Sequence, residues 1–375
     1  MKAIHAARLF TGEAMRTDAA LIVEAGRIRD VCAGADIPHG METERLADDL
    51  ILVPGFIDVQ VNGGGGVLFN DSPDLPTLRV IARAHRRFGT TALMATLITD
   101  TQATMRGAAD AVRAALAVGE PGILGLHLEG PFLNPARKGV HPEVLLRAIT
   151  EDALCFLCEE TPRPLLVTLA PEIVGADAIA RLAAAGVVVA VGHSTASYEQ
   201  VRAADARGFT HLFNAMPPLA GRDPGLVGAA LTSDGFAGII ADGYHVHPAN
   251  LRLALRAKGA GRVMLVTDAM ASVGADITAF RLHGHMVRVA DGRLTTKDGV
   301  LAGAHLDMAS AVRNAVALMG ATLEEALRMA AATPADFLGL PDRGRLVPGA
   351  VADAVAISAN VGVAGVWVAG TRDAP

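Results

Sequence analysis

The chain has 375 residues, 51% of them hydrophobic and 19% charged, so it can bury a large core and form one big α/β domain with a small companion. Its formal net charge of −6, with no basic run, argues against a nucleic-acid partner, and no apolar stretch has the roughly 20 residues that span a membrane. The start of the chain lacks the sustained apolar segment of a signal peptide, and the cysteine count of three is odd. We therefore expect a cytoplasmic protein.

Both ends of the chain have the same strand-and-turn character. Short strand-like pieces occupy residues 1–50, and similar pieces return in 349–357 and 362–370. We expect residues 1–53 and 344–375 to form one small β-sandwich-like domain, and residues 54–343 to form the main domain.

Eight short apolar runs alternate with amphipathic stretches in the main domain. Most of the runs are rich in Val, Ile and Leu without polar alternation, which is typical of strands buried on both faces. Eight β/α alternations predict a closed (β/α)8 TIM-type barrel, with an extra hairpin at 281–294 near its mouth. The predicted strands are residues 51–59, 91–97, 122–129, 165–171, 186–193, 209–214, 236–242 and 263–268, and the predicted helices include 75–88, 102–118, 142–160 and 176–185.

Polar residues follow four of these runs. Glu129, His193, His211 and Asp268 each stand where a run ends, and the carboxyl ends of barrel strands build the active sites of such folds. Taken singly, Glu129 could be a salt-bridge partner, His193 a core histidine and Asp268 a helix cap. Together, two imidazoles and a carboxylate suit a zinc-type ion, and a further carboxylate can move protons. The set therefore favours metal-assisted hydrolysis.

The end of the first barrel strand carries a second polar row. Asp58, Gln60 and Asn62 share parity along the strand and should face the same side. The glycines at 63–66 that follow allow a tight turn, but a glycine run alone is most simply a loop.

Between about residue 50 and residue 348 the chain carries a series of motifs that include Pro-Gly-Phe-Ile-Asp-Val-Gln-Val-Asn-Gly, Leu-His-Leu-Glu-Gly-Pro-Phe, Val-Gly-His-Ser, Thr-His-Leu-Phe-Asn-Ala-Met, Ile-Ala-Asp-Gly-Tyr-His-Val and Val-Thr-Asp-Ala. These motifs and their order resemble the N-acetylglucosamine-6-phosphate deacetylase family of the amidohydrolase superfamily. The resemblance extends more weakly to both ends of the chain.

The resemblance implies a role for each residue of the strand-end set. Glu129, His193 and His211 match the metal ligands of the family, and Asp268 matches its general base and acid. Two-metal members of the superfamily have His-x-His after the first strand, where this chain has Gln-Val-Asn, and no lysine ends the fourth strand. Amides are poor ligands, so the resemblance implies one divalent ion per subunit, zinc first and iron, manganese or cobalt as alternatives.

The resemblance also implies the substrate, a small sugar phosphate. The reaction would be hydrolysis of the acetamide of N-acetylglucosamine 6-phosphate to glucosamine 6-phosphate and acetate, in amino-sugar catabolism and cell-wall recycling. A homodimer with a shared active site is expected, because one of the two phosphate-binding residues, Arg222 and His245, reaches in from the neighbouring subunit. The residues that match substrate contacts are His141, which also polarises the substrate, Asn214, Ala215, Arg222, His245, Leu301, Ala302, Gly303 and Ala304.

Three alternatives stay open at this point. A deacetylase for the galactosamine epimer would differ only at a hydroxyl configuration, which the sequence does not decide. A cyclic-amide hydrolase is disfavoured by the missing lysine. A non-catalytic sugar-phosphate-binding protein would not need the set of Glu129, His193, His211 and Asp268.

Overall fold

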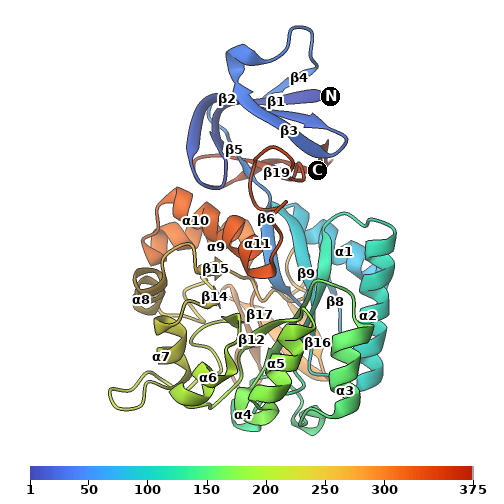
Figure 1. The fold of residues 1–375 in the computed structure, drawn as a ribbon, viewed down its shortest axis with the longest axis vertical. Coiled ribbons are helices and arrows are strands. Elements are labelled where there is room, and N and C mark those ends of the chain that lie inside the picture. Colours follow the sequence, from blue (N-terminus) through green and yellow to red (C-terminus); the bar gives the residue numbers. More distant parts are fainter. Residues whose placement is uncertain (374–375) are drawn as a thin grey trace.

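A branched β-sheet joins the two ends of the chain in the computed structural model, which describes residues 1–373 (Figure 1). Ala374 and Pro375, which the predicted small domain includes, lie outside the described residues. The central strand β1 pairs with β2 along its length and with both β4 and β5 on its other edge, so the sheet divides and curls around its own apolar core. Its strands are β1 (Lys2–Phe10), β2 (Met15–Glu24), β3 (Arg27–Ala33), β4 (Thr43–Arg45), β5 (Ile51–Pro54), β19 (Ala354–Ile357), β20 (Val363–Val368) and β21 (Thr371–Arg372).

Eight parallel strands form the second part of the molecule, which confirms the predicted TIM-type barrel. Each strand pairs with its neighbours in chain order, and a parallel bridge between Val61 and Ala269 closes the ring. Nearly every residue of these strands is buried, as their continuous apolar runs predict. The strands are β6 (Phe56–Val61), β9 (Thr90–Ile98), β10 (Ile123–Glu129), β11 (Leu165–Leu169), β12 (Val188–Val191), β13 (Gly208–Phe209), β14 (Phe236–Ile239) and β15 (Val263–Leu265).

The predicted first strand at 51–59 is wrong as a single element. It divides at Gly55 into β5, which belongs to the small sheet, and β6, which belongs to the barrel. A Cβ atom on Gly55 would lie 2.0 Å from Oγ1 of Thr91, so only glycine fits this crossing point. The chain passes from one part to the other within a single residue.

Helices surround the barrel, and side-chain caps begin several of them. Asp74, Thr101, Ser197 and Thr322 accept hydrogen bonds from backbone N–H groups of the first turn of α1, α2, α6 and α10. The helices are α1 (Leu75–Arg86), α2 (Gln102–Ala117), α3 (Glu151–Cys155), α4 (Pro171–Val174), α5 (Ala176–Ala184), α6 (Tyr198–Ala204), α7 (Gly225–Thr232), α8 (Pro248–Lys258), α9 (Met308–Asn314), α10 (Leu323–Ala330) and α11 (Ala332–Leu338).

The predicted helix at 142–160 is only half right. Regular helix begins at Glu151 and continues as a π-helical turn, η4 (Phe156–Glu160), whereas residues 142–150 form a loop with one 3-10 turn, η3 (Glu143–Leu145). The Arg147 side chain holds this loop by donating to the carbonyl oxygen of Asp100. These tertiary contacts outweigh the helical pattern of the loop.

A three-stranded antiparallel sheet follows the eighth barrel strand and extends the predicted hairpin by one strand. It consists of β16 (Ala279–Leu282), β17 (His285–Ala290) and β18 (Arg293–Thr296), and Asp291-Gly292 forms the turn between the last two. A smaller hairpin, β7 (Gly63–Gly64) with β8 (Val67–Leu68), follows the first barrel strand. Both hairpins lie on the side of the barrel where the strands end.

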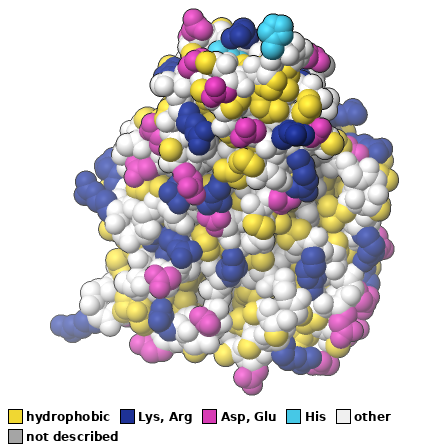
Figure 2. All heavy atoms as spheres, turned by 45° about the horizontal axis from the view of Figure 1, so that its top comes forward, with side chains coloured by type: hydrophobic (Ala, Val, Ile, Leu, Met, Phe, Trp, Pro, Cys, Tyr) yellow, Lys and Arg dark blue, Asp and Glu magenta, His cyan; other side chains and the backbone are white. Residues whose placement is uncertain are grey.

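On the face drawn in Figure 2, acidic and basic side chains alternate around small apolar areas. None of the helices in the described residues is long and apolar enough to cross a membrane.

Candidate metal and active site

Three side chains converge at the carboxyl ends of the barrel strands β10, β12 and β13. Glu129 is the last residue of β10, and His193 and His211 each lie two residues beyond the ends of β12 and β13. Glu129 Oε1 lies 3.1 Å from Nε2 of His193 and 3.0 Å from Nε2 of His211, and the two nitrogens lie 2.9 Å apart. All three residues are buried, and one ligand atom from each lies within 4.8 Å of the others. The group could therefore hold a metal ion.

The protonation of His193 supports this fit. Its Nδ1 lies 2.8 Å from the carbonyl oxygen of Arg137, which can only accept, so Nδ1 carries a proton, and whenever the ring is neutral its lone pair is at Nε2. That lone pair would face a carboxylate oxygen of Glu129 and Nε2 of His211. A cation bound by Oε1 of Glu129 and by Nε2 of both histidines would offset the repulsion between these lone pairs. A hydrogen bond from Nδ1 to a backbone carbonyl is the usual support of a metal-binding histidine.

In the absence of a cation, a proton takes over part of that role. Burial would raise the pKa of the Glu129 carboxyl, but the hydrogen bonds from His193 and His211 hold it well below its ordinary value. Burial opposes protonation of His211, yet the hydrogen bond and the charge of Glu129 raise the pKa of this imidazole. Positive charge is thus favoured at the point where the three residues meet.

The backbone is strained at the same positions. His193, His211 and Asp268 have φ angles of 49°, 30° and 51°, and Ala215 has 52°. Residues with side chains seldom adopt this left-handed region, and they do so mainly where the surroundings compensate the cost, as at active sites. The strands β12, β13 and β15 end at Val191, Phe209 and Leu265, which is two, five and three residues earlier than the sequence predicts.

Asp268 lies beside the group and is held by the polar row of β6. Asn62 Nδ2 donates to Asp268 Oδ1 at 2.7 Å, and Gln60 Nε2 lies 3.2 Å from the same oxygen and 3.1 Å from Glu129 Oε2. Burial, together with the negative charge of Glu129, raises the pKa of Asp268 to about 7. A carboxyl group with this pKa can both take up and release a proton near neutrality.

Asp58 belongs to the same row but bonds to Thr267 rather than to Asp268. It accepts hydrogen bonds from the Thr267 hydroxyl at 2.5 Å and from the N–H groups of Gln60 and Thr267. Burial raises its pKa to about 7 against the effect of these bonds. The pairing of β6 with β9 is irregular between Asp58 and Val61, so the common face that parity predicts for Asp58, Gln60 and Asn62 stays a prediction, and their hydrogen bonds to Asp268 and Thr267 were not predicted.

His141 covers the group from the loop after β10. Its ring lies edge-on to His193, with 4.5 Å between the ring centroids, and its Nδ1 lies 2.7 Å from Oγ1 of Thr99. Burial, with a smaller effect from His193, holds the pKa of His141 well below its ordinary value, so the ring is neutral. The sequence offered no signal for Thr99, which follows β9 and meets His141 only in the folded barrel.

A cavity of about 240 Å³, which we call the catalytic cavity, opens above these residues. It brings together most of the predicted substrate contacts. His245 is held there by Asp242, which accepts from its Nδ1 at 2.5 Å. The residues that line the cavity include the metal group, His141, Asp268, Asn214, Ala215, His245, Leu301 and Gly303.

Three of the predicted contacts lie elsewhere. Ala302 and Ala304 are buried and do not line the catalytic cavity. The N–H of Ala304 donates to the carbonyl oxygen of Asp268 at 2.9 Å, and Gly303, with a φ of 62°, allows this close approach. Arg222 is exposed on the loop before α7, which projects from the barrel in Figure 1, so one chain by itself does not bring Arg222 to the cavity.

The fold and the site together define a class of metal-dependent barrel hydrolases. The model of the amidohydrolase family matches residues 51–372, and the chain belongs to this family. An N-acetylgalactosamine-6-phosphate deacetylase of Shewanella sp. (strain ANA-3) is 46% identical to the chain over 340 residues, which cover 90% of this chain and 85% of the relative. An N-acetylglucosamine-6-phosphate deacetylase of Haemophilus influenzae is 35% identical over 369 residues, 96% of each chain.

Solved structures agree with this placement. The N-acetylglucosamine-6-phosphate deacetylase of Pasteurella multocida matches with a TM-score of 0.96 and 36% identity, and the match covers 100% of both chains. A mutant of the enzyme from Mycobacterium smegmatis, solved in complex with N-acetyl-D-glucosamine 6-phosphate, matches with a TM-score of 0.90 and 36% identity over 99% of this chain and 98% of that one. The resemblance seen in the motifs is confirmed over nearly the whole chain.

Proposed function

We propose that the protein hydrolyses the acetamide of N-acetylglucosamine 6-phosphate to glucosamine 6-phosphate and acetate, in amino-sugar catabolism and cell-wall recycling. The observation that carries the proposal is the convergence of Glu129, His193 and His211 beside the partly exposed Asp268. The deacetylases to which the chain is similar support the choice of substrate. We propose that the protein acts in the cytoplasm.

Glu129, His193 and His211 would hold one divalent ion, for which we propose zinc because two imidazoles and a carboxylate suit it. When bound there, such an ion would supply Lewis acidity for lowering the pKa of water and polarising a carbonyl oxygen. Asp268 accepts the proton of the attacking water and delivers it to the departing amine nitrogen, and its pKa of about 7 suits both steps. Asn62 and Gln60 orient the carboxylate for these transfers.

Substrate orientation depends on the opposite side of the catalytic cavity. Neutral His141 donates to the carbonyl oxygen as negative charge develops there. Asn214, Ala215 and the 301–304 segment position the sugar, and His245 contacts the phosphate. Arg222 offers a planar fork to the phosphate from a second copy of the chain, which makes the active form a homodimer. Equilibrium sedimentation of the protein tests whether it is a dimer. The KM of an Arg222→Ala variant, which should rise, tests whether Arg222 contacts the phosphate.

The galactosamine epimer is a second candidate substrate, because the relative with 46% identity carries that activity in its name. Acetate release from N-acetylglucosamine 6-phosphate and N-acetylgalactosamine 6-phosphate, measured on one sample with known metal content, decides between them. We expect the larger kcat/KM for the glucosamine compound. Turnover of neither compound by metal-loaded protein would contradict the proposed function.

A further inference from the structure

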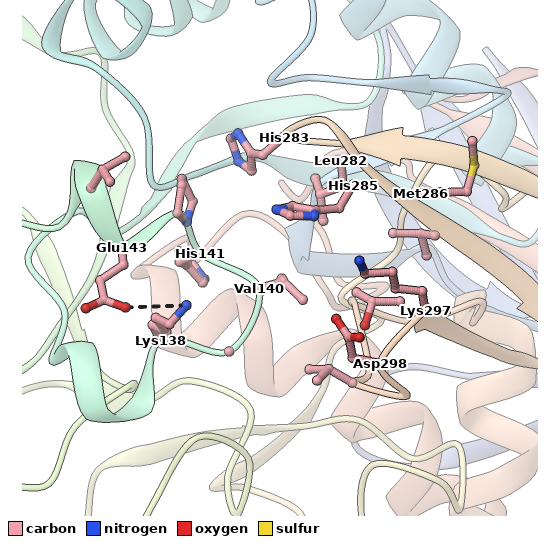
Figure 3. A pocket seen from close by; sticks show the side chains of 16 residues that line it. Lys138, Val140, His141, Glu143, Leu282, His283, His285, Met286, Lys297 and Asp298 are labelled. Carbon is pink, nitrogen blue, oxygen red and sulfur yellow. Dashed lines mark ion pairs between the residues drawn. The ribbon is translucent and has the colours of Figure 1, made fainter.

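A second hollow, with a volume of about 520 Å³, adjoins the catalytic cavity (Figure 3). One wall is the loop 138–144 and the other is the three-stranded sheet β16–β18 with the segment that follows it. We call this hollow the side groove. None of the residues that the sequence predicts for substrate binding belongs to it except His141.

The side groove is continuous with the metal side of the catalytic cavity. The two hollows share Gly139, Val140, His141 and Val300 as lining residues. His141 stands at this junction, with its ring against that of His193. By contrast, the candidate sugar and phosphate contacts around His245 line only the catalytic cavity. A substrate group that extends past the metal group, away from the sugar phosphate, would therefore enter the side groove.

Apolar side chains form the walls of the side groove, although much of their surface is exposed. Met286 is 43% exposed, Val300 46% and Val144 92%, while Leu282 and Val287 form a buried base. Exposed apolar side chains that gather around a concave surface are typical of ligand sites.

Polar side chains also line the side groove. Lys138 is paired with Glu143 at 3.6 Å in the loop, His283 and His285 come from the sheet, and Lys297 and Asp298 lie near Val140, as Figure 3 shows. The apolar side chains lie among these groups, and an uncharged, extended hydrocarbon group fits against them.

We propose that the side groove binds the acyl chain of N-acylated hexosamine 6-phosphates longer than acetyl, so that the protein is a deacylase for such substrates as well. This inference rests on the proposed function, since it uses the same reaction. Water adds to the amide carbonyl carbon, the C–N bond breaks, the amine nitrogen takes up a proton, and the fatty carboxylate leaves in place of acetate. The carbonyl carbon stays beside the metal group, and the chain attached to it passes His141 into the side groove.

The test is a series of N-acetyl, N-butanoyl and N-hexanoyl glucosamine 6-phosphates, assayed by release of the amine with metal-loaded protein. Each buried methylene can raise kcat/KM up to about fourfold, so we expect the hexanoyl compound to be at least as good a substrate as the acetyl compound. A fall of more than about a hundredfold from acetyl to butanoyl would overturn the inference and leave the proposed function intact. Failure of all three compounds would overturn both.

Two substitutions at Met286 test whether the acyl chain binds in the side groove. Met286→Trp fills the side groove and Met286→Glu makes its wall polar, and each should lower kcat/KM for the hexanoyl compound about tenfold while leaving the acetyl compound within twofold. Arg288→Trp is the matched control, because Arg288 is exposed on the same strand β17 but lines neither hollow. Equal losses on both compounds, or an equal effect of the control, would overturn the inference.

Binding without turnover provides an independent readout. In an Asp268→Asn background, calorimetry should give tighter binding of the hexanoyl than of the acetyl compound, and Met286→Trp should abolish the difference. A hexyl glycoside of N-acetylglucosamine 6-phosphate distinguishes the other end of the sugar. Sensitivity of the glycoside, but not of the hexanoyl compound, to Met286→Trp would assign the side groove to the anomeric substituent and refute an acyl site.

Discussion

The metal group and the polar row of β6 are both buried sets of polar side chains at the barrel mouth, yet they differ in how their hydrogen bonds are satisfied. In the row, the carboxylate oxygens of Asp58 accept hydrogen bonds from the hydroxyl and N–H of Thr267 and from the N–H of Gln60. In the metal group, Nε2 of His193 faces a carboxylate oxygen of Glu129 and Nε2 of His211, and it presents a lone pair to them whenever the ring is neutral. The Asp58 carboxylate is thus satisfied within the protein and acts as a support, although Oδ1 of Asn62 in the same row has no partner among the described residues, whereas acceptors that converge form a binding site.

Substitution of a metal ligand should therefore have the largest effect on activity. His193→Ala removes one of three ligands, and we expect loss of the bound metal ion and a fall in kcat/KM of about 10⁴-fold, since the ion contributes several kcal/mol. Metal analysis of the purified variant, with circular dichroism as a control for folding, checks this. A variant that keeps its metal and its activity would exclude His193 as a ligand.

Substitution of the proton carrier should rank second. Asp268→Asn keeps the size of the side chain and lies outside the three converging ligand atoms, so metal content should remain while kcat falls about 10³-fold. Single-turnover kinetics and metal analysis on the same preparation measure both. Turnover near the parent rate would mean that another group moves the proton.

The support row should give a smaller and different loss. Asn62→Ala removes the 2.7 Å hydrogen bond to Asp268, and we expect kcat/KM to fall about ten- to a hundredfold with metal content unchanged. Since this bond lowers the pKa of Asp268, its loss should also move the acidic limb of the pH–rate profile to higher pH. A uniform loss at every pH would indicate only a structural role for Asn62.

The smallest effect is expected at Asp58, and in stability rather than activity. Burial raises its native pKa to about 7, while an unfolded Asp titrates near ~3.9. Between these values the native state holds a proton that the unfolded state has lost, so this group lowers the free energy of unfolding as pH rises from about 4 to about 7. Asp58→Asn should flatten that slope in urea titrations. A slope identical to the parent's would show that Asp58 is ionised in the native state.

The barrel could be predicted from the sequence because its signal is local and repeated. Each apolar run or amphipathic stretch is contained in the residues of the strand or helix that it predicts. The strands β9, β10 and β11 and the helices α1, α2 and α5 therefore begin and end close to the predicted residues. The break at Gly55 could not be predicted, because the residues before it pair with a strand of the small sheet and the residues after it pair with a strand of the barrel. The loop 142–150 failed as a helix for a similar reason, since Arg147 bonds to a neighbouring loop. The boundaries of the two domains, 1–53 with 344–375 and 54–343, stay a prediction.

The sequence by itself determined which chemistry the molecule carries: the residues that meet as a metal group, the carboxylate next to them, and the strands whose ends present both. Only the tertiary structure decided how these side chains are aimed, through left-handed backbone at His193, His211 and Asp268 and through partners such as Thr99 and Asn62 that no spacing connects to them. It also decided that a loop and a distant sheet enclose a side groove beside His141. Residue types follow from local pattern, but orientation and enclosure depend on contacts between segments far apart in the chain, and those exist only once the barrel has closed.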